Sequence, residues 1–168
     1  MKVLDGKRAL VVLTRGMTEL SRLVATTYGP NGSKVAVNKN GRVLMTTDGS
    51  ALAHEMRFRD LHRLGASLVR GASIKVDRSS GDGTSTTILL TAALLEAALD
   101  HHSHRTWNPV ALARDIQRFL PAVEELLHQM HREPDEATLE RVAEMASHGD
   151  RMVSEHVVNA VLRVGDDG

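Results

Sequence analysis

Apolar residues in the amino-terminal part of the chain recur every three or four positions. The residues that share this spacing are Leu10, Leu13, Met17, Leu20 and Val24. Such spacing places them on one face of a helix with about 3.6 residues per turn. We therefore predict an amphipathic helix from about Asp5 to Thr26. The pattern stops at residues 27–32, where two glycines and a proline favour a turn.

Two short segments with strand-like composition follow, at residues 34–38 and 43–47. They flank Asn40 and Gly41, and an Asn-Gly pair favours a hairpin because both residues tolerate positive φ. An isolated pair of strands is only marginally stable in water. We therefore expect this hairpin to pack on helices or to pair with another strand.

The middle of the chain predicts two helices. The first pattern runs from Ala51 to about Val76, with an interruption near residues 58–60. The second runs from Thr84 to about Leu99 and is apolar on nearly every side. A helix with apolar residues all round belongs in an interior. We therefore predict that this second helix is the most buried one in the chain.

The remaining sequence opens with a polar connector at residues 101–107, in which three closely spaced histidines favour a surface segment over a zinc site. Asn108 and Pro109 are typical of a helix cap and a first helical residue. They introduce a long amphipathic helix. Two shorter and more polar helices are predicted at residues 137–145 and 152–164.

Composition supports a mainly helical protein. The aromatic residues are Tyr28, Phe58, Trp107 and Phe119. The core must therefore be filled by Leu, Val, Ile, Ala and Met, and abundant Ala and Leu at helical spacing favour closely packed helices. The predicted fold class is mainly α with a small β-hairpin.

Charge and cysteine content exclude several functional classes. Lys and Arg number 21, and Asp and Glu also number 21, so no net field would attract nucleic acid or an anionic membrane. The chain of 168 residues has no cysteine for a disulfide framework or a thiolate metal site, and its first residues lack a signal peptide's apolar stretch. These features predict a cytoplasmic protein that binds neither nucleic acid nor a membrane.

One stretch carries candidate chemistry, a glycine-flanked acid followed by four hydroxyl side chains at residues 81–87. Glycines permit a tight turn and a close approach to a ligand. A helix that begins there offers free N–H groups and a partial positive charge to phosphate, and Asp82 suits Mg²⁺. The stretch lacks the lysine of a Walker P-loop. A plain cap of the following helix explains the same pattern.

Two further turns make a binding site more favoured than a plain helix cap. Residues 27–32 and the pair Asp48-Gly49 also lie at the ends of predicted elements, where ligands commonly bind. Each turn alone is more typical of plain structure. Three of them in one small domain favour a common binding site.

The order of these motifs resembles the amino-terminal part of a GroEL-type, group I chaperonin subunit. The motifs are Thr-Tyr-Gly-Pro-Asn-Gly, a hairpin, Thr-Asp-Gly, Gly-Asp-Gly-Thr-Ser-Thr and Asn-Pro, and the resemblance extends from about Asp5 to Gly168. It implies an incomplete equatorial-domain-like helical bundle at residues 1–131, which binds ATP. It also implies an outgoing intermediate segment at residues 132–168 and no apical domain.

The resemblance assigns roles to individual residues. It implies that the turn after the first helix contacts the nucleotide phosphates and that Asp82 coordinates Mg²⁺. The phosphate-contacting residues of that turn would be Thr27, Tyr28, Gly29 and Pro30. The residues that cradle the phosphates at the second turn would be Gly83, Thr84, Ser85 and Thr86. Tyr28 stands where the family usually has leucine.

The resemblance also implies a catalytic contribution from Asp48, which would lie near the γ-phosphate and influence hydrolysis. Thr47 replaces the lysine that precedes this acid in the family, which removes a cation from the phosphate site. The aspartate that positions the attacking water belongs to the returning segment of a family subunit and is absent here. We therefore expect ATP binding rather than independent ATPase turnover.

The partners implied by the resemblance are other copies of the chain or other chaperonin subunits in a ring that assists protein folding. Unfolded polypeptide and a co-chaperonin would bind only through the apical domain, which this sequence lacks. An alternative function is a truncated, non-catalytic relative that acts as an oligomerisation or interaction module. Apolar surface left exposed by the missing segments would favour such association.

Overall fold

The computed structural model describes residues 6–29, 31–39, 41–56, 58, 61–104 and 108–165. The chain divides into two compact units, residues 1–107 and residues 108–168. The first unit contains α1 (Gly6–Ala25), β1 (Val35–Lys39), β2 (Arg42–Thr46), α2 (Gly49–Glu55), α3 (His62–Ser80) and α4 (Thr84–His104). The second unit contains α5 (Pro109–Met130), α6 (Glu136–Ala146) and α7 (Arg151–Val164). The predicted fold class, mainly α with a small β-hairpin, is confirmed.

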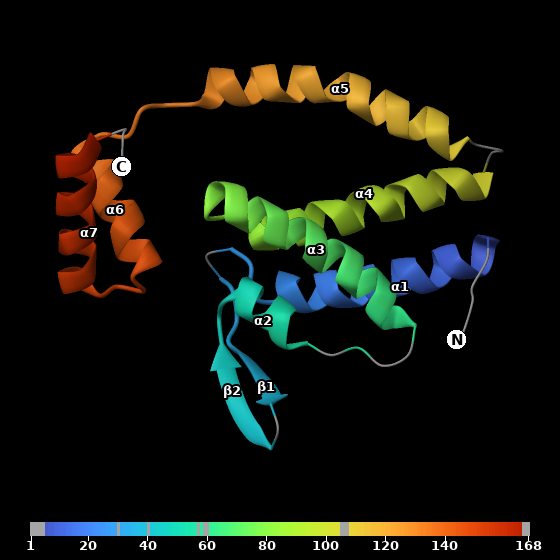
Figure 1. The fold of residues 1–168 in the computed structure, drawn as a ribbon, viewed down its shortest axis with the longest axis horizontal. Coiled ribbons are helices and arrows are strands. Elements are labelled where there is room, and N and C mark those ends of the chain that lie inside the picture. Colours follow the sequence, from blue (N-terminus) through green and yellow to red (C-terminus); the bar gives the residue numbers. More distant parts are fainter. Residues whose placement is uncertain are drawn as a thin grey trace. The chain divides into compact units, whose positions relative to one another are not determined.

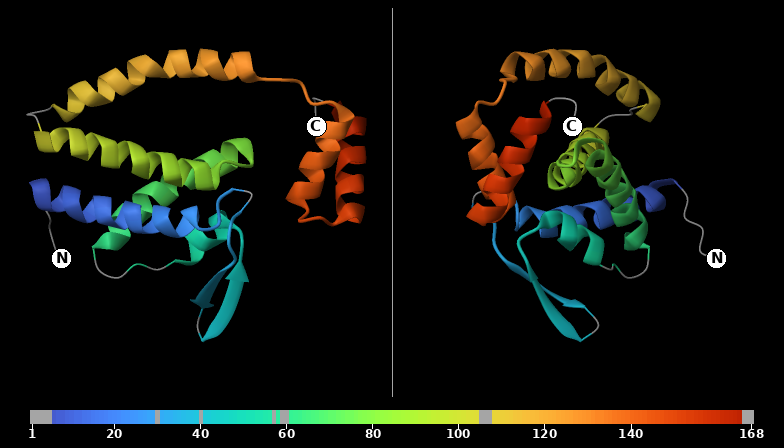
Figure 2. Two further views of the ribbon diagram at one scale, coloured as in Figure 1. Left: turned by 180° about the vertical axis from the view of Figure 1, so that it is seen from behind. Right: turned by 60° about the vertical axis from the view of Figure 1, so that its left-hand side comes forward.

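The core of the first unit lies where α1, α3 and α4 pack on one another, with α2 against α1 and α4 (Figure 1). Its buried hydrophobic side chains are aliphatic, as the shortage of aromatic residues predicts. The core residues are Leu20, Val24, Ala53, Ala66, Val69 and Ile88, with Met17 and Phe58 packed against them. Seen from behind, α1 and α4 run side by side while α3 crosses them (Figure 2).

Two glycines allow the backbones of α1 and α3 to approach closely. A methyl group on Gly16 would overlap the backbone carbonyl of His62, and one on Gly65 would overlap the carbonyl of Leu13. Each helix therefore contributes a glycine at its contact with the other. The crossing depends on residues without side chains, because backbone atoms cannot rotate out of the way.

The hairpin forms as predicted, with β1 and β2 paired antiparallel and Val37 opposite Leu44. Gly41 adopts a φ of +81°, which glycine accommodates without strain, and its N–H donates to Oδ1 of Asn38 over 3.0 Å. Asn40 lies outside the described residues. Val37 is buried, and the hairpin packs against α2.

The middle helices differ from the sequence prediction in their lengths. The predicted helix at 51–76 is two helices, α2 and α3, separated by residues 56–61 around the expected interruption. Arg70 of α3 donates through Nη2 to the carbonyl of Met56 over 2.8 Å, which ties the end of α2 to α3. Burial lowers the pKa of the Arg70 guanidinium.

The helix predicted to end near Leu99 continues to His104, into the segment predicted as a connector. That prediction was wrong because the segment up to His104 contains no glycine or proline to end a helix. Among the side chains of α4 that the structure describes, the expected burial is confirmed for Thr84, Ile88 and Ala92. Leu90 and Leu94 each keep 58% of their surface exposed, because α1 and α3 cover only part of this apolar helix.

The second unit begins with the predicted cap, where Oδ1 of Asn108 accepts from the N–H groups of Val110 and Ala111 over 2.9 and 3.4 Å. No residue of α5 is buried. The short helices α6 and α7 pack as a pair around Ala143 and Val158. Among the described helices, none is long and apolar enough to cross a membrane.

Candidate functional site

The turn after α1 is the first of the three predicted site segments. The helix unwinds through hydrogen bonds such as Thr27 N–H to the carbonyl of Val24 over 3.0 Å. Gly29 takes a φ of +81°, and the Ser33 N–H closes the loop onto the carbonyl of Thr26 over 2.7 Å. Thr27 and Tyr28 are therefore held at the end of α1. Pro30, also predicted to contact phosphate, lies outside the described residues.

The second segment is the start of α2. Asp48 caps this helix, because its Oδ1 accepts the N–H of Ser50 over 2.7 Å. The cap explains the residue type structurally, and the predicted catalytic contribution of Asp48 stays a prediction. Thr47 precedes the cap and is exposed.

The third segment is the turn between α3 and α4. Gly81 and Gly83 have φ of +72° and +87°, so the chain reverses through conformations that other residues rarely adopt. The carboxylate of Asp82 accepts the N–H of Gly83 over 2.5 Å. The carbonyl of Gly83 accepts the N–H of Thr87 over 2.9 Å, which starts α4. By general helix geometry, the first N–H groups of α4 have no partner within the helix.

Gly49 brings the three segments together. It is buried, and a methyl group built on it would overlap the hydroxyl of Ser85. The same methyl group would lie 3.1 Å from Oγ1 of Thr27 and 3.1 Å from Cγ1 of Val24. The end of α1, the start of α2 and the start of α4 therefore meet at one point (Figure 1).

A cavity of ≈ 290 Å³ opens at this junction. Its lining residues come from the starts of α2 and α4 and from the end of α3. They are Asp48, Ser50, Asp77, Gly81, Asp82, Thr84 and Ser85. Thr84 is buried, and its hydroxyl donates to Oδ1 of Asp77 over 3.4 Å. The cavity thus presents carboxyl and hydroxyl oxygens at the start of a helix.

Some of the predicted site residues line the cavity and others do not. Asp48, Asp82, Thr84 and Ser85 line it, whereas Thr27 does not line it and lies next to Gly49. Gly83 forms the turn, and the exposed Thr47 and Gly29 are not among the lining residues. Tyr28 and Thr86 contact each other, with their hydroxyl oxygens 3.0 Å apart.

Sequence reasoning missed Ser50 and Asp77 as lining residues, and it gave Gly81 only as part of the glycine turn. Asp77 was passed over because the predicted helix ended near Val76, whereas in the structure it lies within α3, four residues before the glycine that ends the helix. Its carbonyl accepts the N–H of Gly81 over 2.7 Å. That helical spacing is the signal that could have placed its side chain next to the turn.

The charges around the cavity determine what it can bind. Three carboxyl groups line it, from Asp48, Asp77 and Asp82, and none of the lining residues is Lys or Arg. A phosphate group alone would be repelled by those carboxylates, whereas a divalent cation would be attracted. Phosphate fits this cavity only together with a cation.

The donor set fits a hard cation such as Mg²⁺, because every polar side-chain atom that lines the cavity is oxygen. Among the described residues, no three His, Cys, Asp or Glu side chains converge closely enough to hold a metal ion by themselves. Mg²⁺ usually binds through one or two carboxylates together with substrate phosphates. Asp82 is suited to hold such an ion, since it lies in the cavity lining on the turn that the two flanking glycines allow.

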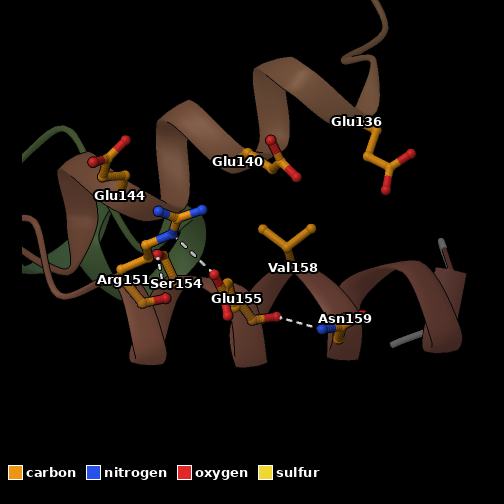
Figure 3. Close-up of a pocket in the computed structure, with 8 residues that line it drawn as sticks. All are labelled: Glu136, Glu140, Glu144, Arg151, Ser154, Glu155, Val158 and Asn159. Carbon is orange, nitrogen blue, oxygen red and sulfur yellow. Dashed lines mark hydrogen bonds and ion pairs between the residues drawn. The ribbon is translucent and has the colours of Figure 1, made fainter.

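A second groove of ≈ 310 Å³ lies between α6 and α7 in the other unit (Figure 3). Glu136, Glu140 and Glu144 of α6 face it. Its one lining cation, Arg151, pairs with Glu155 over 3.0 Å. The groove lacks both a glycine turn and a free positive charge, so it is not suited to phosphate.

Comparison with known proteins identifies the class to which this fold and cavity belong. The model of the TCP-1/cpn60 chaperonin family matches residues 20–168, so the chain belongs to this family. The resemblance to a chaperonin is confirmed at that level.

Solved chaperonin structures have the same fold. The chaperonin gp146 from the bacteriophage EL 2 (Pseudomonas aeruginosa), crystallised in the presence of ATP-BeFx, matches in two crystal forms with TM-scores of 0.77 and 0.74. Its sequence is 28% identical, and each match covers 94% of this chain and 28% of gp146. A group III chaperonin in the open state matches with a TM-score of 0.77 and 25% identity, over 95% of this chain and 32% of that one. This chain therefore spans less than a third of the length of these chaperonins.

Proposed function

We propose that this chain is the ATP-binding part of a chaperonin subunit that assists protein folding in an oligomeric ring. The observation that carries this proposal is the meeting of three separate turns around Gly49, beside a cavity lined by Asp48, Asp82, Thr84 and Ser85. The presence of an ATP analogue in the crystals of gp146 supports the choice of nucleotide. In this proposal, residues 1–131 form the equatorial segment and residues 132–168 the outgoing intermediate segment.

The chain's own residues would act by binding and orienting phosphate. The first N–H groups of α4 and the hydroxyl of Ser85 would donate to phosphate oxygens, and the Thr84 hydroxyl could join them by turning its proton away from Asp77. Asp82 would hold Mg²⁺, which neutralises the charge between the phosphates and the carboxylates when bound. Asp48 would lie next to the terminal phosphate. Membership of the group I, GroEL-type branch remains a prediction from the motifs.

Binding is proposed rather than independent turnover. The catalytic aspartate that the resemblance assigns to a returning segment is not among these residues, and Thr47 supplies no positive charge. A chain that binds Mg-ATP but hydrolyses it only together with other chaperonin segments would agree with this proposal.

The test compares two substitutions that remove one negative charge each. Asp82→Asn retains an oxygen that can accept the N–H of Gly83 while removing the charge that would hold Mg²⁺. Asp115→Asn removes a charge from an exposed pair with Arg118, which contributes little to stability. We expect calorimetry to show lost Mg-ATP binding in the first variant and unchanged binding in the second. Equal Mg-ATP affinities in both variants would refute the role of Asp82.

The second candidate function is an interaction module, and the exposed apolar face of α5 favours it. Phe119, Leu127 and Met130 each keep 60% or more of their surface exposed. Size-exclusion chromatography with mass measurement distinguishes the candidates. A defined oligomer that binds no Mg-ATP would favour the interaction module, whereas Mg-ATP binding would favour the nucleotide site.

A further inference from the structure

Tyr28 links two of the segments that meet around Gly49, beside the cavity. Its phenolic oxygen lies 3.0 Å from Oγ1 of Thr86, a residue 58 positions later in the chain. Tyr28 belongs to the turn after α1, whereas Thr86 lies in the first turn of α4. Among the described residues, no other side-chain hydrogen bond joins this turn to α4.

The chemistry of the pair bears on phosphate binding. Each hydroxyl carries one proton and can accept as well as donate. One proton is used in the bond between the two oxygens, so the pair retains one O–H that can donate to a third group. The nearby cavity is lined by three carboxyl groups and by no Lys or Arg. A neutral O–H donor can therefore interact with a phosphate oxygen without any change in charge.

The surroundings leave this pair accessible. Tyr28 keeps 49% of its surface exposed, so a ligand can reach its ring without opening the core. The turn is otherwise closed by its own backbone, through hydrogen bonds such as Gly32 N–H to the carbonyl of Gly29 over 3.0 Å. The phenol is thus not needed to form the turn. Its hydroxyl instead contacts Thr86 at the start of α4.

We propose that Tyr28 is a positioning residue of the nucleotide site, which orients the Thr86 hydroxyl and leaves one shared O–H to donate to the terminal phosphate. This role rests on the proposed function. It predicts a phosphate-dependent contribution, so ATP should gain from the pair and AMP should not. A purely structural role would affect both nucleotides equally.

The test uses Tyr28→Phe, which removes only the hydroxyl, and Thr86→Val, which replaces the partner hydroxyl by a methyl group. One hydrogen bond is worth about 1 kcal/mol, which converts to a five- to sixfold change in affinity. We expect Tyr28→Phe to weaken Mg-ATP binding by about that factor and to leave AMP binding unchanged. In the Thr86→Val background, the same substitution should have no further effect.

The chain has a single tyrosine, so tyrosine labelled at Cζ gives one carbon NMR signal, next to the hydroxyl that makes the contact. We expect the Cζ signal of Tyr28 to shift in Thr86→Val and on addition of Mg-ATP. If the Cζ signal shifts neither in Thr86→Val nor on addition of Mg-ATP, the positioning role is overturned. It is also overturned if Tyr28→Phe binds Mg-ATP like the wild type while Asp82→Asn does not. That last result would leave the proposed function standing. A wild-type chain without Mg-ATP affinity would overturn both proposals, even with the Cζ shift present in Thr86→Val.

Discussion

Substituting Gly49 by alanine tests whether the three site segments are packed as the structure has them. The added methyl group would overlap the Ser85 hydroxyl and press on Thr27 and Val24. Overpacking of this kind costs about 1–3 kcal/mol. Because Gly49 has a helical position without positive φ, the alanine also gains about 1 kcal/mol of helix propensity. We expect a net loss of up to about 2 kcal/mol in the free energy of unfolding.

Gly71 provides the matched control for this experiment. It also lies in a helix, but a methyl group there would meet nothing within 4 Å. Gly71→Ala should therefore stabilise the chain by about 0.5–1 kcal/mol. Urea denaturation measures both variants, and calorimetry should show weaker Mg-ATP binding for Gly49→Ala alone. If Gly49→Ala is as stable as Gly71→Ala, the packing at the junction is not as described.

Two further predictions concern the helix crossing and a helix cap. Gly65→Ala should lower the free energy of unfolding by about 2–3 kcal/mol, since its methyl group would overlap the carbonyl of Leu13 and the backbone cannot rotate away. Urea denaturation measures this loss. An unchanged urea midpoint would contradict the close approach of α1 and α3. Hydrogen bonds from Thr138 lower the pKa of Asp135 in the folded chain. The ionised carboxylate therefore stabilises the start of α6 fully at pH values above the pKa of the unfolded chain. This stabilisation is lost as the pH falls through the lowered pKa of the folded chain. The NMR signal of the Thr138 amide should titrate with a midpoint below the ordinary aspartate pKa of about 3.9. The Asp135→Asn variant should show no such titration step. A midpoint at or above about 3.9 would be inconsistent with the cap.

Local signals made much of the fold predictable. The amphipathic spacing of the first helix gave α1 to within about one residue at each end, and Asn108 with Pro109 marked the start of α5. The Asn-Gly pair placed the hairpin turn, because tolerance of positive φ is a property of these residue types, and Gly41 does take a positive φ.

Features set by packing between distant segments were not predictable in the same way. Periodicity could not show which sides of α4 remain uncovered, so Leu90 and Leu94 were expected to be buried. The glycine contacts between α1 and α3 require knowledge of the crossing point. Likewise, Asp77 reaches the cavity only because α3 ends beside α4. The candidate site was thus predictable in its three turns but not in its full lining.

The central claim is that Mg-ATP binds where these turns meet, and NMR of the backbone amides tests it most directly. Addition of Mg-ATP to the labelled chain should shift the amides of residues 26–29, 48–50 and 81–86 together. With the Mg²⁺ chelated, these shifts should largely disappear, because the carboxylates would repel free nucleotide. Absence of shifts, or shifts confined to the acidic groove at residues 136–159, would contradict the proposed site.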